Sequence, residues 1–311
     1  MKFIHAAAVV LAVTAFSGAQ AADQTTLRIG VQKYGTLVIL QEQHSLETRL
    51  AAEGVKVEWK EFPAGPQLLE ALSVGSIDFG TTGEAPPVFA QAAQTPLVYV
   101  GTEPAAPTGE AIIVPKDSPI QSIADLKGKR VVLNKGSNVH YLLVQALGSA
   151  NLTPKDIESV YLTPADARAA FERGSVDAWA IWDPFLAAAQ AATGARLLTD
   201  AKDLAPNRQF YLAHRDFAKA HPALVAEVLD EIAKTDHWAE QHQHEVAQLL
   251  SPRTGIPVPV LDLAVSRLGY GVTRLDDKAI DDQQRIADAF FQLGLIPTKV
   301  TVRDAVWTPN S

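Results

Sequence analysis

The segment KGSNVHYLLVQAL, residues 135 to 147, places a serine, an asparagine and a histidine at the start of a predicted helix. Ser137 and His140 are the residue types of a nucleophile and its base, whereas Ser137 and Asn138 at a helix start are also typical of sites that hold an anion. Ser137 does not lie in a G-x-S-x-G elbow, and the spacing is not that of a phosphate-binding or dinucleotide-binding loop. The pattern favours holding over catalysis, and a secreted Ser/His hydrolase remains the alternative.

Short β-rich runs alternate with helical runs from Leu27 onward, which predicts an α/β fold with a mainly parallel sheet. Strands are expected at 27–32, 55–62 and 76–80, with helices at 36–52, 65–75 and 84–94. The same order recurs, with strands at 130–134, 157–163 and 175–182 and helices at 137–150, 164–174 and from 183. GSID at 75–78 and GSVD at 174–177 each lie between a helix and a strand. The repetition predicts two similar lobes.

The limits of the lobes follow from the segments between the repeats. Residues 101–119 are rich in Pro and Gly and predict a crossover, and the strand-like run at 208–216 predicts the return crossing. We expect residues 22–113 to form the first part of lobe 1, residues 114–212 to form lobe 2, and the mostly helical residues 213–311 to return to lobe 1. Two lobes with two crossings imply a ligand cleft beyond the carboxyl ends of the strands.

The N-terminus and the composition indicate an exported protein. Residues 1–21 combine Lys2, a short apolar run and small residues near Ala21, which predicts a signal peptide cleaved after Ala21 and a periplasmic protein. The sequence has no cysteine, which excludes disulfides, thiolate metal sites and a lipid-modified N-terminal cysteine. The formal net charge of −8, without a basic stripe, predicts that nucleic acid is not a partner. We expect no metal and no cofactor.

The predicted strand-to-helix turns that face the cleft are rich in small and hydroxyl residues. They contain the pairs Gly35-Thr36, Thr82-Gly83 and Ser137-Asn138. Such residues let backbone N–H groups approach a ligand closely, and helix N-termini carry a partial positive charge. The predicted ligand is therefore an anion. Ser137 and Asp183 are equally good helix N-caps, and Trp182 can serve as core packing instead of a cleft wall.

Two long stretches carry a family resemblance. EFPAGPQLLEALSVGSIDFGTTGEAPPVFAQAA at 61–93 and YLTPADARAAFERGSVDAWAIWDPF at 161–185 resemble the periplasmic aliphatic sulfonate-binding proteins of ABC importers. The resemblance implies a two-lobed type II periplasmic binding protein fold, an alkanesulfonate ligand, an ABC permease partner in the inner membrane, a monomer and no catalysis. Relatives of this fold bind taurine, nitrate or pyrimidine precursors of thiamin, and these ligands remain alternatives.

The resemblance also implies roles for single residues. The sulfonate group would be held by Thr82, Gly83, Ser137 and Asn138, with Gln32 assisting. A sulfonate stays ionised at working pH, so fixed N–H and hydroxyl donors suit it, while its apolar tail needs an apolar wall.

The remaining implied roles concern the wall and the rim of the pocket. His140 and Trp182 would shape the pocket, and Glu84, Glu103 and Asp183 would lie near the tail or rim, where they disfavour a second anionic group. No catalytic residue is expected. The candidate ligand-binding set is Gln32, Gly35, Thr36, Thr82, Gly83, Glu84, Ser137, Asn138, His140, Trp182 and Asp183.

Overall fold

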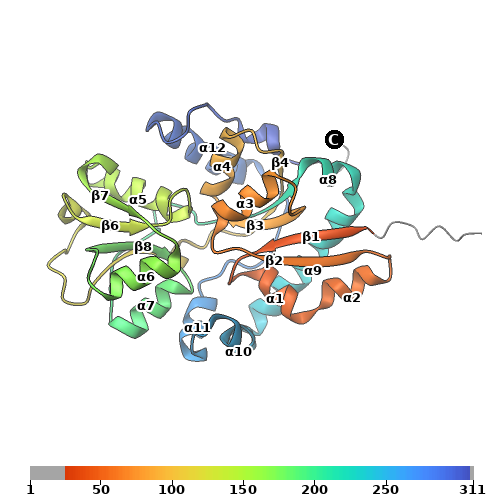
Figure 1. The fold of residues 1–311 in the computed structure, drawn as a ribbon, viewed down its shortest axis with the longest axis horizontal. Helices are drawn as coiled ribbons and strands as arrows, with labels where there is room; N and C mark the ends of the chain where they lie inside the picture. Colours follow the sequence, from red (N-terminus) through yellow and green to blue (C-terminus); the bar gives the residue numbers. More distant parts are fainter. Residues whose placement is uncertain (1–24, 309–311) are drawn as a thin grey trace, which may run out of the picture.

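The computed structural model describes residues 25–308 as two α/β lobes that lie side by side (Figure 1). Each lobe is built on a five-stranded sheet, with the order β2-β1-β3-β10-β4 in the first and β7-β6-β8-β5-β9 in the second. The first sheet consists of β1 (Thr26–Val31), β2 (Lys56–Glu61), β3 (Phe79–Gly83), β4 (Leu97–Thr102) and β10 (Gln209–His214). The second consists of β5 (Glu110–Val114), β6 (Arg130–Leu133), β7 (Glu158–Tyr161), β8 (Ala178–Trp182) and β9 (Arg196–Asp200). The expected signal peptide, residues 1–21, lies outside the described residues.

The two sheets repeat one pairing pattern. β1 pairs in parallel with β2 and β3, and β6 pairs in parallel with β7 and β8. One strand in each sheet is antiparallel to its neighbours, namely β10 between β3 and β4, and β5 between β8 and β9. In both sheets this is the strand through which the chain enters from the other lobe. The prediction of a mainly parallel α/β fold with two similar lobes is confirmed.

The repeated tetrapeptide forms the same corner in both lobes. Gly75 and Gly174 follow α3 (Gly65–Ser73) and α6 (Pro164–Glu172) with φ angles of 66° and 68°, which favour glycine. Asp78 and Asp177 then accept hydrogen bonds from the backbone N–H of an arginine in the neighbouring strand, at 2.9 and 2.7 Å. β3 and β8 begin only after this corner, so both start later than the predicted strands at 76–80 and 175–182.

The first lobe also contains α1 (Thr36–Gln43), α2 (Ser45–Ala51) and α4 (Ala85–Ala92). The prediction of one helix over 36–52 is wrong, because the chain breaks at His44. His44 has a left-handed φ of 53°, and its N–H bonds to the carbonyl of Gln41, which ends α1. The break lets α2 take its own direction and contact both β2 and the later helix α9 (Pro222–Gln241).

The second lobe contains α5 (Asn138–Ser149), α6 and α7 (Phe185–Thr193). The chain changes sheet between β4 and β5 and again between β9 and β10, so residues 103–109 and 201–208 form the two crossovers. Glu110 already pairs with the second sheet and Gln209 with the first. Both exchanges therefore fall a few residues before the expected lobe limits at 113/114 and 212/213, because strand pairing decides which lobe a segment joins.

The C-terminal helices pack mainly on the first lobe (Figure 1). They are α8 (Arg215–Ala220), α9, α10 (Gln243–Thr254), α11 (Val258–Val265) and α12 (Asp277–Gln292). α9 contacts α1 and α12 contacts α4, while α11 reaches α7 of the second lobe. Short 3₁₀ turns occur at Pro107–Gly109, Ile123–Leu126, Pro154–Asp156 and Val302–Ala305. Within residues 25–308, no helix has both the length and the apolarity that a bilayer crossing requires.

Candidate functional site in the interlobe cavity

A cavity lies between the lobes where the two crossovers pass. Both lobes, both crossovers and the segment after α11 contribute to its wall. Its volume is about 90 Å³, and since one water needs roughly 10–15 Å³ by the same measure, it can hold a ligand of several non-hydrogen atoms. Eight of the eleven predicted binding residues line it: Gln32, Gly35, Thr36, Gly83, Ser137, Asn138, Trp182 and Asp183.

The start of α1 presents open backbone to the cavity. Gly35 precedes the helix with a φ of 104°, which favours glycine, and a Cβ at this position would meet no atom within 4 Å. The first N–H groups of a helix have no acceptor within it and carry a partial positive charge. Gln32 and Lys33 line the cavity as well, and the Gln32 amide donates to the carbonyl of Thr81 at 3.2 Å. This mouth therefore suits an anion.

The end of β3 contributes alternate residues to the cavity. Thr81 and Gly83 line it, whereas Thr82 has no exposed surface and lies against Gly65. The sequence predicted that Thr82 lies in a turn, but the strand continues to Gly83, and successive side chains of a strand point to opposite faces. Thr82 is therefore not a cavity residue, and the position belongs to Thr81.

Asn138 at the start of α5 joins the two lobes. Its Oδ1 accepts a hydrogen bond from the N–H of Ala85 at the start of α4 at 3.2 Å, and its Nδ2 donates to Asn207 in the second crossover at 2.9 Å. Asn207 donates in turn to the carbonyl of Ala106 in the first crossover at 2.8 Å. Gly83 makes room for this arrangement, because a Cβ there would lie 2.1 Å from the Asn138 amide. The mouth of α5 is thus a contact between lobes.

Ser137 and His140 do not form a catalytic pair. The Ser137 hydroxyl donates to the carbonyl of Asn134 at 2.7 Å, and Nδ1 of His140 accepts from the N–H of Gly136 at 3.2 Å. Contrary to the prediction, His140 is not in the cavity wall, because its ring is 3% exposed and packs among aromatic rings from α4 and α12. Burial lowers the pKa of His140 to about 4, and a nearby lysine adds to the effect.

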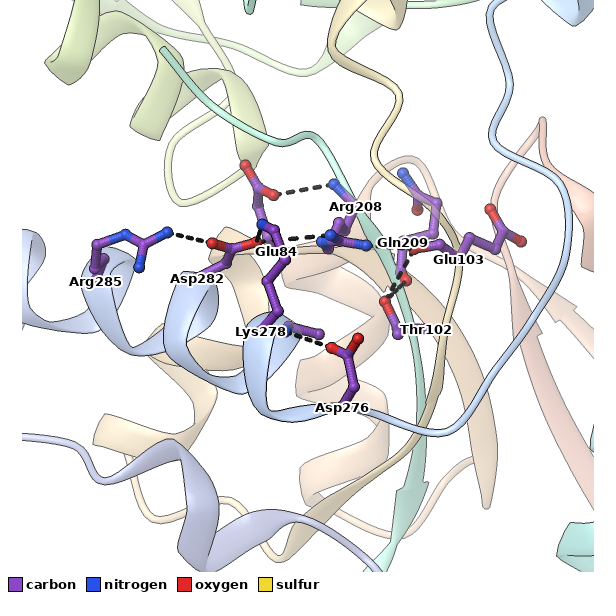
Figure 2. Close-up of polar contacts among 10 residues, drawn as sticks. Glu84, Thr102, Glu103, Arg208, Gln209, Asp276, Lys278, Asp282 and Arg285 are labelled. Carbon is purple, nitrogen blue, oxygen red and sulfur yellow. Dashed lines mark hydrogen bonds and ion pairs between the residues drawn. The ribbon is translucent and has the colours of Figure 1, made fainter. Parts of the chain in front are cut away.

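Glu84 also lies outside the cavity, contrary to the prediction. Figure 2 shows its carboxylate bonded to Arg208, and Oε2 accepts from the Arg208 N–H at 3.0 Å. The Arg208 guanidinium lies 3.6 Å from Asp282 of α12, which also pairs with Lys278 and Arg285. Burial raises the pKa of Glu84 to about 7, although backbone hydrogen bonds oppose the rise. Glu84 therefore fastens the second crossover to the first lobe.

Trp182 and Asp183, at the end of β8, give the cavity an apolar wall and a paired charge. Trp182 is half-buried and lines the cavity together with Phe185. Asp183 accepts from the N–H of Ala187 at 3.0 Å and lies 3.2 Å from the guanidinium of Arg267, which follows α11. Burial raises the pKa of Asp183 to about 6 in spite of Arg267. The charge of Asp183 is therefore balanced by a cation at the same wall.

A second buried carboxyl group lines the cavity at the first crossover. Glu103 is 3% exposed, and its Oε1 accepts a hydrogen bond from the hydroxyl of Tyr211. Asp236 of α9 lies beside this group and accepts from the Thr36 hydroxyl at 2.6 Å and from the N–H of Val272 at 2.8 Å. Burial raises the pKa of Glu103 to about 8, and the charge of Asp236 adds to the rise. Thr36 lines the cavity, but its hydroxyl is committed to Asp236.

The polar cavity residues that the sequence analysis missed include Asn207, Gln209 and Arg267. Asn207 and Gln209 lie in or just after the second crossover, and a cleft between two crossovers must be bordered by both. The two predicted crossovers are therefore the sequence signal that points to Asn207 and Gln209. Arg267 comes from the C-terminal helices, outside the repeated pattern, so no local feature points to it.

The cavity can hold a ligand with fixed donors and an apolar wall, and the Ser137 hydroxyl and the His140 ring do not meet in it. In the part of the chain from residue 25 to 308, no group of three or more His, Asp or Glu is arranged to hold a metal ion. Two α/β lobes, two crossovers and a cavity between them define the two-lobed periplasmic binding protein fold. Comparison with known proteins makes the assignment specific: the NMT1/THI5-like family model matches residues 50–246, and the chain belongs to that family.

Individual relatives agree with this assignment. The chain is 44% identical over 302 residues to the aliphatic sulfonates-binding protein of Escherichia coli (strain K12), a match that covers 97% of this chain and 94% of the relative. The alkanesulfonate-binding protein SsuA from Xanthomonas axonopodis pv. citri, bound to MOPS, superposes with a TM-score of 0.88 at 42% identity over 92% of this chain and 99% of that one. The periplasmic aliphatic sulphonate binding protein SsuA from Escherichia coli gives a TM-score of 0.83 at 44% identity, covering 91% and 92%. The resemblance inferred from the sequence is confirmed.

Proposed function

We propose that this chain is the periplasmic solute-binding component of an ABC importer, and that it holds an alkanesulfonate in the interlobe cavity for delivery to an inner-membrane permease. The observation that carries the proposal is the cavity itself: a helix N-terminus and neutral donors on one side, an apolar wall on the other, in a chain whose relatives are sulfonate-binding proteins. The signal peptide cleaved after Ala21, the periplasmic location and the monomeric state belong to the same proposal.

The sulfonate group is assigned to the mouth of α1. Gly35 leaves the helix start open, and Gln32 supplies an amide. A hydrogen bond to a charged group contributes about 1.5–3 kcal/mol, so a few such contacts account for micromolar binding. The alkyl tail is assigned to Trp182 and Phe185. Closure of the lobes about residues 103–109 and 201–208 brings these two sets together around the ligand.

A thermal-shift screen tests the proposal. Methane- to hexanesulfonate, taurine, nitrate, sulfate and a pyrimidine precursor are compared in buffers without sulfonates, which excludes MES, MOPS and HEPES. A ligand bound only by the folded state stabilises it by about 2.7 kcal/mol at a concentration 100 times its Kd, so an alkanesulfonate should raise the Tm by several degrees. A rise with nitrate or a pyrimidine and none with any sulfonate contradicts the proposal. Release of a product from any of these compounds contradicts the binding-protein assignment itself.

A further inference from the structure

Glu103 is the buried carboxyl group of the cavity that has no cation to balance it. Asp183, the other carboxylate of the wall, is paired with Arg267 at 3.2 Å. No ion pair of Glu103 occurs among residues 25–308, although the side chain is 3% exposed and lines the cavity. Arg208 reaches only its backbone carbonyl, at 3.2 Å. Figure 2 shows the Glu103 carboxyl group extending away from the cluster formed by Glu84, Arg208 and Asp282.

The groups around Glu103 make a negative charge there costly. Asp236 lies beside it on α9 and bonds to Thr36, and the phenols of Tyr211 and Tyr270 also approach it. Lys33 and Arg267 line the same cavity, but Lys33 is exposed and Arg267 is already engaged by Asp183. A ligand anion in this cavity would add a further negative charge. An unpaired buried charge costs several kcal/mol, whereas a neutral carboxyl group at the same place can donate a hydrogen bond.

Two hydroxyl groups approach the carboxyl group of Glu103. Oε1 accepts the hydrogen bond of Tyr211, and the Thr36 hydroxyl, which donates to Asp236 at 2.6 Å, also lies within hydrogen-bonding reach of the carboxyl group. We propose that Glu103 is protonated in the ligand complex and donates a hydrogen bond from Oε2 to the bound alkanesulfonate, so that the carboxyl group keeps its proton beside the anion. This inference rests on the proposed function and adds that the protonated state of Glu103 selects the ligand. The raised pKa of Glu103, about 8, agrees with a neutral group at pH 7.

The proposal distinguishes between two kinds of sulfonate. A ligand with a neutral tail leaves Glu103 protonated and binds most tightly at or below pH 7. A ligand with an ammonium tail, such as 2-aminoethanesulfonate, would gain a counter-charge only from the ionised form of Glu103, so a protonated Glu103 offers it no such gain. Glu103 as a hydrogen-bond donor therefore selects against the ammonium tail.

Calorimetric titration with butanesulfonate between pH 6 and pH 9 tests the proton. The sulfonate stays ionised throughout, so a pH dependence reports the protein. The affinity should fall by about tenfold between pH 7 and pH 9, because the free carboxyl group loses its proton near pH 8. At pH 9, titrations in Tris and in borate, which differ in ionisation enthalpy, should show uptake of nearly one proton per ligand. This measurement needs only the wild-type protein, so it does not depend on how well a variant folds.

Two variants assign the proton to its residue. Glu103→Gln keeps an acceptor for Tyr211 and a donor toward the cavity, so its affinity should not change between pH 7 and pH 9, and its proton uptake at pH 9 should vanish. Glu84→Gln is the matched control, since Glu84 is another buried glutamate with a raised pKa, but it lies outside the cavity. It should keep the wild-type profile.

The outcomes separate this inference from the proposed function. If no alkanesulfonate binds at any pH, the proposed function fails and the inference fails with it. If butanesulfonate binds with no pH dependence and no proton uptake, or if the dependence is lost in Glu84→Gln and kept in Glu103→Gln, only the inference is overturned. Tighter binding of 2-aminoethanesulfonate than of ethanesulfonate, lost in Glu103→Gln, would overturn it as well and make Glu103 an ionised acceptor.

Discussion

The N-terminal ends, or mouths, of α1 and α5 occupy corresponding places in the two lobes, but their surroundings differ. At α1 the backbone around Gly35 faces open space, because a Cβ on Gly35 would meet no atom of residues 25–308 within 4 Å, its chain neighbours apart. At α5 the side chains of Ser137, Asn138 and His140 are committed to protein partners within and across the lobes. Equal position in a repeated fold therefore does not give equal function: one mouth is left for a ligand, and the other fastens the lobes together.

The contrast extends to the charges at each mouth. The α5 side carries a neutral imidazole in an aromatic cluster, whereas the α1 side carries buried acids whose protons depend on pH. A ligand site can use a group that changes charge near neutral pH, because the protonation state of that group then depends on the ligand that binds.

The largest expected effect concerns the α5 side. The wild type should lose stability as the pH falls, and the variant His140→Phe should not share this loss. The pKa of His140 is about 4 in the folded protein against 6.5 for an ordinary histidine, so the unfolded chain binds the extra proton between these values. The stabilising contribution is complete above pH 6.5 and is lost as the pH falls. Relative to His140→Phe, the wild type should lose about 2 kcal/mol of unfolding free energy by pH 5. Urea unfolding of both proteins at pH 7 and pH 5 measures this.

The matched control for that experiment is His237→Phe. His237 is exposed on α9, so this variant shows what the same change of residue type does at the surface. Other titrating groups, such as Glu84, are common to all three proteins and cancel in the comparison. If the unfolding free energies of the wild type and His140→Phe changed with pH in parallel, His140 would be solvated. Its place would then be the cleft wall, as the sequence predicted.

The next effect concerns the contact of Asn138 with Ala85 and Asn207, which we call the seal between the lobes. The variant Gly83→Ala should bind the ligand more weakly. The added Cβ would lie 2.1 Å from the Asn138 amide, so Asn138 must give up its contacts with Ala85 and Asn207 or the lobes must separate. Overpacking of this kind costs about 1–3 kcal/mol, which corresponds to roughly a ten- to hundredfold weaker Kd for butanesulfonate. Calorimetry measures the change.

Gly148→Ala in α5 provides the control for the seal. A Cβ at Gly148 meets no atom within 4 Å, and its φ is not in the left-handed region, so the same change of residue type should leave the Kd unaltered. An unchanged Kd in Gly83→Ala would show that Asn138 does not occupy this place in the ligand complex, and the distinction between the two mouths would then fail.

The sequence predicted the lobes because each requirement behind them is local. A glycine that ends a helix in the left-handed region and an aspartate that binds the next strand lie within one tetrapeptide, so GSID and GSVD report the same corner twice. The small residues of the helix mouths were found for the same reason. Local pattern is sufficient where the partner is a near neighbour in the chain.

The sequence did not predict which side chains face the cavity, because that depends on register and on distant partners. A strand that ends at Gly83 instead of residue 80 turns Thr82 away and brings Thr81 in. His140 is drawn into an aromatic cluster by Phe290, which is 150 positions later in the sequence. Arg267 reaches the wall only because α11 contacts the second lobe. None of these contacts can be predicted from a few consecutive residues of the sequence.

The smallest expected effect separates the apolar wall from the polar mouth and concerns Trp182→Ala. Burial of one methylene contributes up to about 0.8 kcal/mol, so the wild-type Kd should tighten by at most about fourfold for each carbon added from methane- to butanesulfonate. If Trp182 contacts the tail, the variant should lose this increment while its affinity for methanesulfonate, the internal control, changes little. An equal loss for every chain length would mean that Trp182 supports the fold of β8, and the second lobe would then supply the seal without supplying the tail site.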